Sequence, residues 1–309
     1  MSFLQQISQL VSDPAPGYVF EMSEAGVAFA KGAETGFLPF EPATLVVSPV
    51  EDNVIKPEAV TAALKSVAPL DDSKKRAAAK KRRAALILPD YAARVNVLDF
   101  DSFPSAPEEQ LALIRFRLKK TLPFDIDSAA VSYFAQPPEK TGGKIEVVAA
   151  IVALGVIARY EAMLRSMNFH AGDVTTSALA ALNLYPAAPT EQGHAGISVI
   201  AKLSGRVLTV MVMRGATLKL FRCVALDHVS DNQASENQAG DDEILAVLRP
   251  TFSYVEDELG APVNRLILCG FREGALPGLP GEHGQLHSRF GTPGAFNAGL
   301  LGYLEGMQN

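Results

Sequence analysis

The chain has 309 residues, of which 48% are apolar, and a formal net charge of −6. This length and apolar fraction predict a globular protein that divides into two domains. The acidic balance argues against nucleic acid as the main partner, because such partners require a basic surface. Its two cysteines, Cys223 and Cys269, form no CxxC pair, so we expect neither a disulfide framework nor a zinc site.

The first residues predict a β-hairpin followed by a strand and a helix. Apolar side chains alternate across residues 17–30, and an apolar run at 45–50 predicts the next strand. Residues 57–68 carry apolar positions at helical spacing after a proline, which predicts a helix. Strands are expected at 84–88 and 93–100, with a turn at Pro89 and Asp90 between them.

The middle of the chain predicts a helix over a small sheet. Leu111, Ile114, Leu118 and Leu122 fall on one stripe of a helix that Pro123 ends. Strands are expected at 128–136 and 145–152, a helix at 156–167, and the start of another helix at 173–181. Residues 186–196, rich in proline and glycine, predict a domain boundary.

The second half repeats this order of elements. A hairpin is expected at 196–202 and 207–213, a strand at 217–224, a helix at 243–259 and a short strand at 265–269. A last helix is expected at 295–304. The longest apolar run, 147–158, is shorter than the roughly 20 residues that cross a bilayer. The N-terminus lacks the basic flank of a signal peptide, so we expect a cytoplasmic protein.

One segment, Lys74–Arg83, is strongly basic although the chain as a whole is acidic. It has seven cationic side chains in ten residues. Two alternatives remain for it. It is either a solvated linker or a contact with anionic lipid headgroups, where each charge contributes about 1 kcal/mol. No aromatic residue interleaves the cations, so base stacking is not expected.

The central sequence carries a family resemblance. It rests on the segments Ala84–Asp90, Val95–Phe100, Phe103–Pro104, the helix that ends in Leu122-Pro123-Phe124, and Ile145–Met167. These segments resemble the PilM-like proteins of type IV pilus assembly, which belong to the actin, hexokinase and Hsp70 superfamily. The resemblance continues more weakly in the helix at 243–259 and the strand at 265–270.

This resemblance implies an α/β protein with a two-lobed, actin-like fold of the duplicated ribonuclease H type. A small α+β subdomain is inserted in the first lobe. The first lobe is expected to comprise residues 1–83 and 150–192, the inserted subdomain residues 84–149, and the second lobe residues 193–309.

In that superfamily two strand-turn-strand loops hold ATP, each with an acid followed two positions later by glycine. In the first loop the acid position is Glu21 and the glycine position is Ser23. In the second loop Ala201 replaces the acid and Leu203 replaces the glycine. The superfamily also has a pair or triplet of glycines on the adenosine side of the nucleotide, and only Gly270 is present at that position here. The resemblance therefore implies a degenerate nucleotide site.

From this degenerate site we expect a pseudo-ATPase with no catalytic residue, no metal and no cofactor. Residual binding of ATP and Mg²⁺ is the alternative. Glu21 and Glu24 are interpreted as exposed glutamates of a turn. A zinc pair at His283 and His287 is not expected, because the surrounding glycines and proline disfavour the helix that it would need.

The leading hypothesis for function is a cytoplasmic scaffold of a type IV pilus, secretion or competence complex, peripheral to the inner membrane. The resemblance implies that it binds the N-terminal cytoplasmic tail of a PilN-like membrane protein, in a groove between the first lobe and the inserted subdomain. The candidate partner-binding residues are Phe100, Phe103, Leu111, Ile114, Arg115, Leu122 and Phe124.

Two other functions compete with this hypothesis. One is an ATP-binding ATPase or kinase of the same superfamily. The other is the cytoplasmic domain of a secretion-platform protein, which is disfavoured because no hydrophobic anchor precedes Asn309. The candidate partner-binding residues also have a simpler interpretation, as the packed core of the small subdomain.

Overall fold

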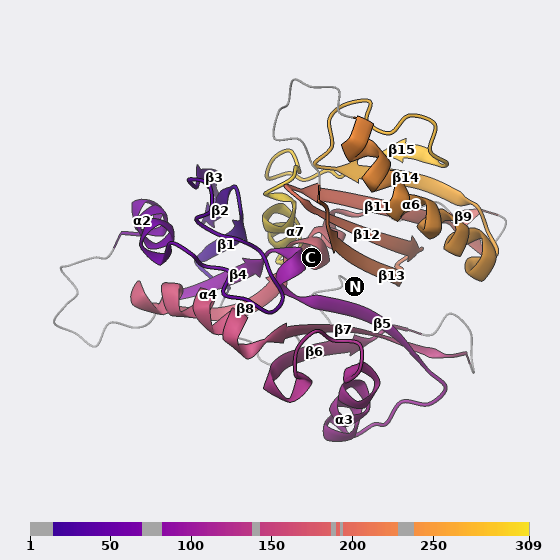
Figure 1. The fold of residues 1–309 in the computed structure, drawn as a ribbon, viewed down its shortest axis with the longest axis horizontal. Coiled ribbons are helices and arrows are strands. Elements are labelled where there is room, and N and C mark those ends of the chain that lie inside the picture. The colour runs from indigo at the N-terminus through magenta and orange to yellow at the C-terminus, as the bar shows by residue number, and fades with distance from the viewer. Residues whose placement is uncertain are drawn as a thin grey trace.

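The computed structural model describes residues 15–69, 82–137, 143–186, 190–191, 194–227 and 238–308. They form two five-stranded sheets, a three-stranded sheet and a two-stranded ribbon (Figure 1). Residues 74–81 of the basic run lie outside the described residues, so both interpretations of that run stay open. No helix in the described ranges is long and apolar enough to cross a membrane.

The first five-stranded sheet has the strand order β3-β2-β1-β4-β8. Its first three strands are antiparallel, whereas β4 is parallel to β1 and β8 is parallel to β4. The strands are β1 Tyr18–Ser23, β2 Gly26–Lys31, β3 Glu34–Pro39, β4 Arg82–Leu88 and β8 Phe169–Thr176.

The second five-stranded sheet repeats this topology, with the order β13-β12-β11-β14-β15. Again three antiparallel strands are followed by two parallel ones. The strands are β11 Ile197–Ser204, β12 Val207–Arg214, β13 Thr217–Ala225, β14 Val263–Cys269 and β15 Glu282–Gly284. The predicted duplication into two lobes is therefore confirmed.

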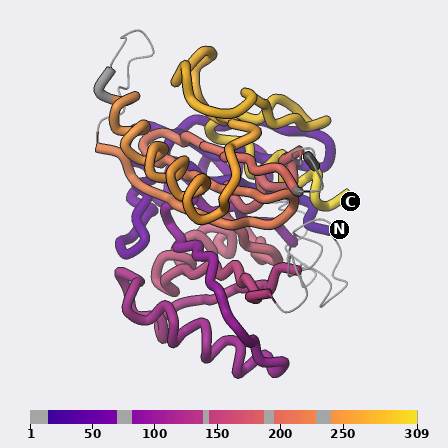
Figure 2. Tube along the Cα trace, turned by 90° about the vertical axis from the view of Figure 1, so that its right-hand side faces the viewer, coloured from indigo at the N-terminus to yellow at the C-terminus, as the bar shows by residue number. Residues whose placement is uncertain are grey.

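The three-stranded sheet belongs to the inserted subdomain and has the order β5-β7-β6. Its strands are β5 Arg94–Phe100, β6 Ala129–Ala135 and β7 Ile145–Ala153, and helix α3, Pro107–Leu118, packs on it. Figure 2 shows this subdomain, in purple and pink, projecting below the two lobes.

The predicted division of the chain needs correction at this subdomain. Residues 84–88 were assigned to the insertion, but they form β4 at the centre of the first sheet. Their side chains are buried on both faces, which an apolar strand with two parallel neighbours requires. The inserted sheet begins with β5 and ends at Ala153.

Helices separate the sheets into layers. α2, Pro57–Val67, and α4, Leu154–Ser166, cover one face of the first sheet. α6, Gln238–Leu259, covers the far face of the second sheet. Between the lobes lie two short helices, α5 Ser177–Ala181 and α7 Ala298–Gly306, whose side chains contact both sheets.

Glycines allow these two central helices to touch. A Cβ atom at Gly299 would lie 2.7 Å from the Cα atom of Ser177, and one at Gly302 would overlap the carbonyl of Ala180. Real Cβ atoms do not approach so closely, so the α5–α7 contact requires glycine at both positions. Although α7 belongs to the range predicted for the second lobe, it also packs on the first sheet.

Two segments differ from the sequence-based prediction. Residues 173–176, predicted to begin a helix, are the end of β8, and helix α5 starts only at Ser177. β8 is an edge strand with several polar residues, so it lacks the apolar alternation that identifies a strand. Residues 45–50, predicted as a strand, contribute a single bridge from Leu45 to Val54.

The side chain of Gln136 attaches the inserted subdomain to the second lobe. Its amide forms the two hydrogen bonds to a backbone that a neighbouring strand would otherwise form. The amide of Gln136 donates to the carbonyl of Leu218 (2.7 Å) and accepts from its N–H (2.8 Å). Beside it, the ammonium of Lys219 contacts both oxygens of Glu146, at 2.8 and 2.9 Å. These contacts fix the small sheet relative to β13.

We expect Gln136→Met to lower the free energy of unfolding by about 2–4 kcal/mol, because it leaves two buried backbone groups of Leu218 without partners. Urea unfolding of the full chain measures this. Ser132→Ala, at an exposed position of the preceding strand β6, serves as the control and should change stability by less than about 0.5 kcal/mol. Equal stability of the two variants would contradict the role given to Gln136.

Candidate functional site

The loops predicted to hold a nucleotide meet in the cleft between the lobes. Glu21 and Ser23 end β1, and Lys202 and Ser204 end β11, all four lining a small cavity. The prediction named the wrong positions on β11. Because side chains alternate along a strand, Ala201 and Leu203 face α6 on the other side of the sheet.

The cavity in this cleft has a volume of about 20 Å³. A buried water requires about 10–15 Å³ on this scale, whereas ligand pockets usually measure about 300–1,000 Å³. Gly270 does not line this cavity; it has φ +80° and lies directly against the carbonyl of Leu203 and against Ala295. The cavity therefore has room for about one water and none for a triphosphate.

A buried ion pair fills the centre of the cleft. The ammonium of Lys202 lies 3.0 Å from Oδ2 of Asp90, with side chains 2% and 1% exposed. Asp90 also accepts from the N–H of Ala178 (2.6 Å) and the hydroxyl of Thr209 (3.2 Å), and Lys202 donates to Ser204 (2.7 Å). Burial disfavours the ammonium, but Asp90 and Glu21 outweigh it and raise the pKa of Lys202.

Glu21 is also buried here, which corrects the expectation of an exposed turn glutamate. Its carboxylate accepts from the hydroxyl of Ser177 and from the N–H of Leu300, the latter at 2.6 Å. Burial raises the pKa of Glu21, although Lys202 and these two hydrogen bonds oppose the rise. Glu21 thus connects β1 to α5 and α7.

Further contacts surround the small cavity. Phe37 of β3 stacks on Phe296, with ring centroids 6.2 Å apart. Ser204 donates to the carbonyl of Ala295. Glu24 accepts from the N–H of Val47 at 2.8 Å. All of these residues except Phe37 line the cavity, so its walls are held together by their own contacts.

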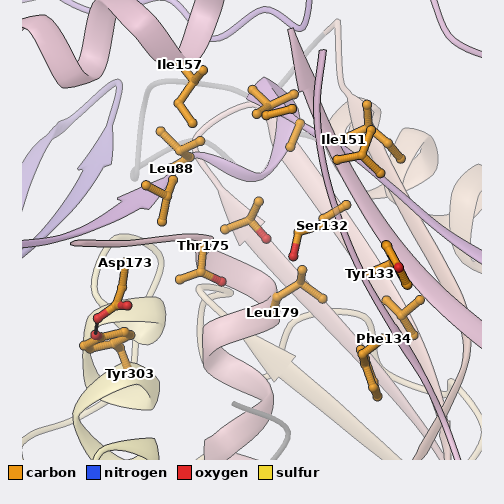
Figure 3. A pocket seen from close by; sticks show the side chains of 18 of the residues that line it. Leu88, Ser132, Tyr133, Phe134, Ile151, Ile157, Asp173, Thr175, Leu179 and Tyr303 are labelled. Carbon is orange, nitrogen blue, oxygen red and sulfur yellow. Dashed lines mark hydrogen bonds between the residues drawn. The ribbon is translucent and has the colours of Figure 1, made fainter. Parts of the chain in front are cut away.

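A second, open site lies between the first lobe and the inserted subdomain. This groove has a volume of about 430 Å³, and its walls are the strands β6 and β8. Each is the last strand of its sheet among the described residues. Figure 3 shows Ser132 of β6 and Thr175 of β8 on opposite walls, with Leu179 of α5 below Ser132 in this view.

The groove is lined mainly by apolar side chains and continues onto an apolar rim. Leu88, Ile151 and Ile157 lie inside it (Figure 3). At its edge, Val174 and Met307 are 37% and 42% exposed. An apolar hollow with apolar residues exposed around it is typical of a site that binds another molecule.

The seven candidate partner-binding residues lie elsewhere. Ile114 and Phe100 are buried in the core of the inserted subdomain, and Phe103, Leu122 and Phe124 pack against that core. Leu111 is half-buried, and Arg115 lies 3.8 Å from Asp127. None of the seven lines the groove. Their role in binding a partner stays a prediction, and their packing supports the simpler interpretation.

Several residues of the two sites were not identified from the sequence. One signal was present: Lys202 is the only charged residue in the apolar strand Ile197–Ser204, and a buried lysine requires an acidic partner. The groove gave no such signal, because its lining residues come from segments between Leu88 and Met307.

Comparison with known proteins identifies the fold. No protein-family model and no curated protein matches the sequence. Among solved structures, the chain is similar to a chain of the PilM–PilN type IV pilus biogenesis complex, with 15% identity and a TM-score of 0.58. The match covers 86% of this chain and 84% of that one.

Two further solved structures have TM-scores below 0.5. The cytoplasmic domain of EpsL, an inner membrane component of the type II secretion system of Vibrio cholerae, is 12% identical over 94% of each chain, with a TM-score of 0.49. A Bacteroides thetaiotaomicron protein with an actin-like ATPase fold is 12% identical over 83% of this chain and 82% of that one. Its TM-score is 0.44. The duplicated topology and the first match confirm the predicted two-lobed, actin-like fold.

We expect Lys202→Met to lower the free energy of unfolding by about 3–5 kcal/mol, because it leaves Asp90 as an uncompensated buried charge. Adding Asp90→Asn should recover most of this loss, since asparagine is uncharged and still accepts from Ala178. Urea unfolding of the two variants and the parent chain measures the effect. A double variant no more stable than Lys202→Met would contradict this account.

The raised pKa of Glu21 predicts a pH dependence of stability. A group with a raised folded-state pKa stabilises the fold most below its unfolded value of 4.5, and this contribution is lost as pH rises through the folded pKa. Glu21→Gln removes the titration and can still bond both Ser177 and Leu300. Its stability relative to the parent should therefore increase from pH 5 to pH 8 in urea unfolding. A constant difference would refute the assignment.

Proposed function

We propose that this protein is a non-catalytic scaffold of a type IV pilus, secretion or competence complex, and that it binds a peptide segment of a membrane protein. One observation carries the proposal: the cleft that would hold a nucleotide is filled, while an apolar groove beside it is open. The fold retains two lobes, but its accessible binding surface lies between the first lobe and the insertion.

The filled cleft supports the non-catalytic part of this proposal. A bound triphosphate would need room and backbone N–H groups that approach its oxygens. Here the ammonium of Lys202 occupies the centre and is already paired with Asp90. Glu21, the one acid left at a loop position, is bonded to Ser177 and Leu300. Binding ATP would therefore require these buried contacts to break.

The groove supports the binding of an extended segment. Among the described residues, β6 and β8 are the outermost strands of their sheets and lie on its two sides, and an added strand can form main-chain hydrogen bonds to such a strand. The apolar lining would receive alternate side chains of the segment. We propose that the segment is the N-terminal cytoplasmic tail of a PilN-like protein, because the similar solved structure is a PilM–PilN complex.

This partner implies a location. A protein that holds the cytoplasmic tail of an inner-membrane protein would lie in the cytoplasm, against the inner membrane. EpsL is described as a component of the inner membrane. Placement beside the membrane is thus part of the proposal and follows from the partner.

Two measurements test the proposal. We expect a peptide that spans the tail of a PilN-like protein to raise the unfolding temperature in a saturable way, because it binds only the folded protein. Mg-ATP should give no saturable rise at millimolar concentration. A rise with Mg-ATP at micromolar concentration would favour the alternative, an actin-like ATPase.

We expect Val174→Arg to weaken peptide binding at least about tenfold, because it places a charged side chain on the apolar wall of the groove. Fluorescence anisotropy with the labelled tail peptide measures this. Val50→Arg is the matched control, since Val50 is 50% exposed and does not line the groove. Equal affinity of both variants would show that the peptide binds elsewhere.

A further inference from the structure

The groove has a single charged side chain. Among the described residues that line it, Asp173 of β8 is the only one with a formal charge. Figure 3 places Asp173 and Tyr303 on the β8 side of the groove, and Tyr133 and Phe134 on the β6 side. The groove therefore has an acidic wall that faces an aromatic one.

The carboxylate of Asp173 is oriented by a hydrogen bond and has further lone pairs that can accept hydrogen bonds. Tyr303 of α7 donates to Oδ2 at 2.7 Å (dashed line in Figure 3). Burial and Asp173 both raise the pKa of Tyr303, so its hydroxyl keeps its proton and remains a donor. An ionised carboxylate has about four lone-pair sites, and this bond uses one of them.

Arg83 is the neighbouring cation, but it does not line the groove. Its guanidinium is 3.6 Å from Oδ1 of Asp173, longer than a good charge-assisted hydrogen bond. The side chain of Asp173 is 43% exposed, whereas that of Arg83 is 22% exposed. The carboxylate is therefore the charge that an occupant of the groove would meet.

We propose that Asp173 accepts a hydrogen bond from a lysine or arginine of the bound segment, and that this contact sets which side of the segment faces β8. The inference rests on the proposed function and adds to it the chemistry of the partner. The cation lies on the wall formed by Asp173 and Tyr303, and apolar side chains on the other side of the segment face Tyr133 and Phe134. Cytoplasmic ends of membrane proteins carry an excess of lysine and arginine, which suits this arrangement.

The test is a double-mutant cycle between the protein and the peptide. The probe is a synthetic peptide that spans the N-terminal cytoplasmic tail of a PilN-like membrane protein, with each lysine or arginine replaced by glutamine in turn. Asp173→Asn removes the charge but keeps an acceptor for Tyr303. We expect it to weaken binding about fivefold, as for a partly exposed ion pair, and to reduce the dependence on salt.

One peptide substitution should then be coupled to the protein variant. Replacing the cation that meets Asp173 should weaken binding to the parent chain and have no further effect on Asp173→Asn. Asp99→Asn, at an exposed position of β5 outside the groove, is the control and should leave affinity unchanged. If Asp173→Asn fails to fold, Tyr303→Phe keeps the charge but removes the bond that orients it, and should give a smaller loss.

The outcomes separate this inference from the proposed function. If the parent chain binds no tail peptide, both are overturned. If the parent chain binds but Asp173→Asn has the same affinity and salt dependence, only the role of Asp173 is overturned. Tighter binding by Asp173→Asn would also overturn it, because the occupant would then carry an acid that pairs with Arg83.

Discussion

The buried ion pair between Lys202 and Asp90 occupies the space between the lobes and so limits what that space can bind. Two carboxylates, Asp90 and Glu21, share one buried ammonium, so a full negative charge would remain if both were ionised. This imbalance adds to burial in raising the pKa of Glu21. The lobes are thus joined by internal hydrogen bonds and by the buried ammonium of Lys202.

A buried ion pair can join two lobes with little net gain in free energy, because the desolvation of its charges can exceed their Coulombic attraction. Here further hydrogen bonds offset part of that cost, because Asp90 also accepts from the N–H of Ala178 and the hydroxyl of Thr209, and Lys202 also donates to Ser204. Each partner comes from a different element of the chain. The pair therefore specifies one arrangement of the lobes, in addition to any stability that it contributes.

Sequence periodicity predicted most of the fold but less of either site. Alternation and helical spacing identified the hairpins, α2, α3 and α4, because burial of one face imposes a period. Periodicity failed for β8, whose open edge is not covered and so needs no apolar pattern. It also failed at Ala201 and Leu203, since one residue of misalignment exchanges the faces of a strand. The groove depends on how two sheets and three helices are placed, which no local pattern encodes.

Helix α7 connects the closed cleft to the open groove. At its N-terminal part, the N–H of Leu300 bonds to Glu21 in the cleft. At its C-terminal part, Tyr303 and Met307 form part of the groove wall, and Tyr303 holds Asp173. Gly299 and Gly302 fix the helix against α5, so it has little freedom to shift. A wall fixed before binding saves the entropy of ordering it, which favours an extended peptide that must itself be ordered.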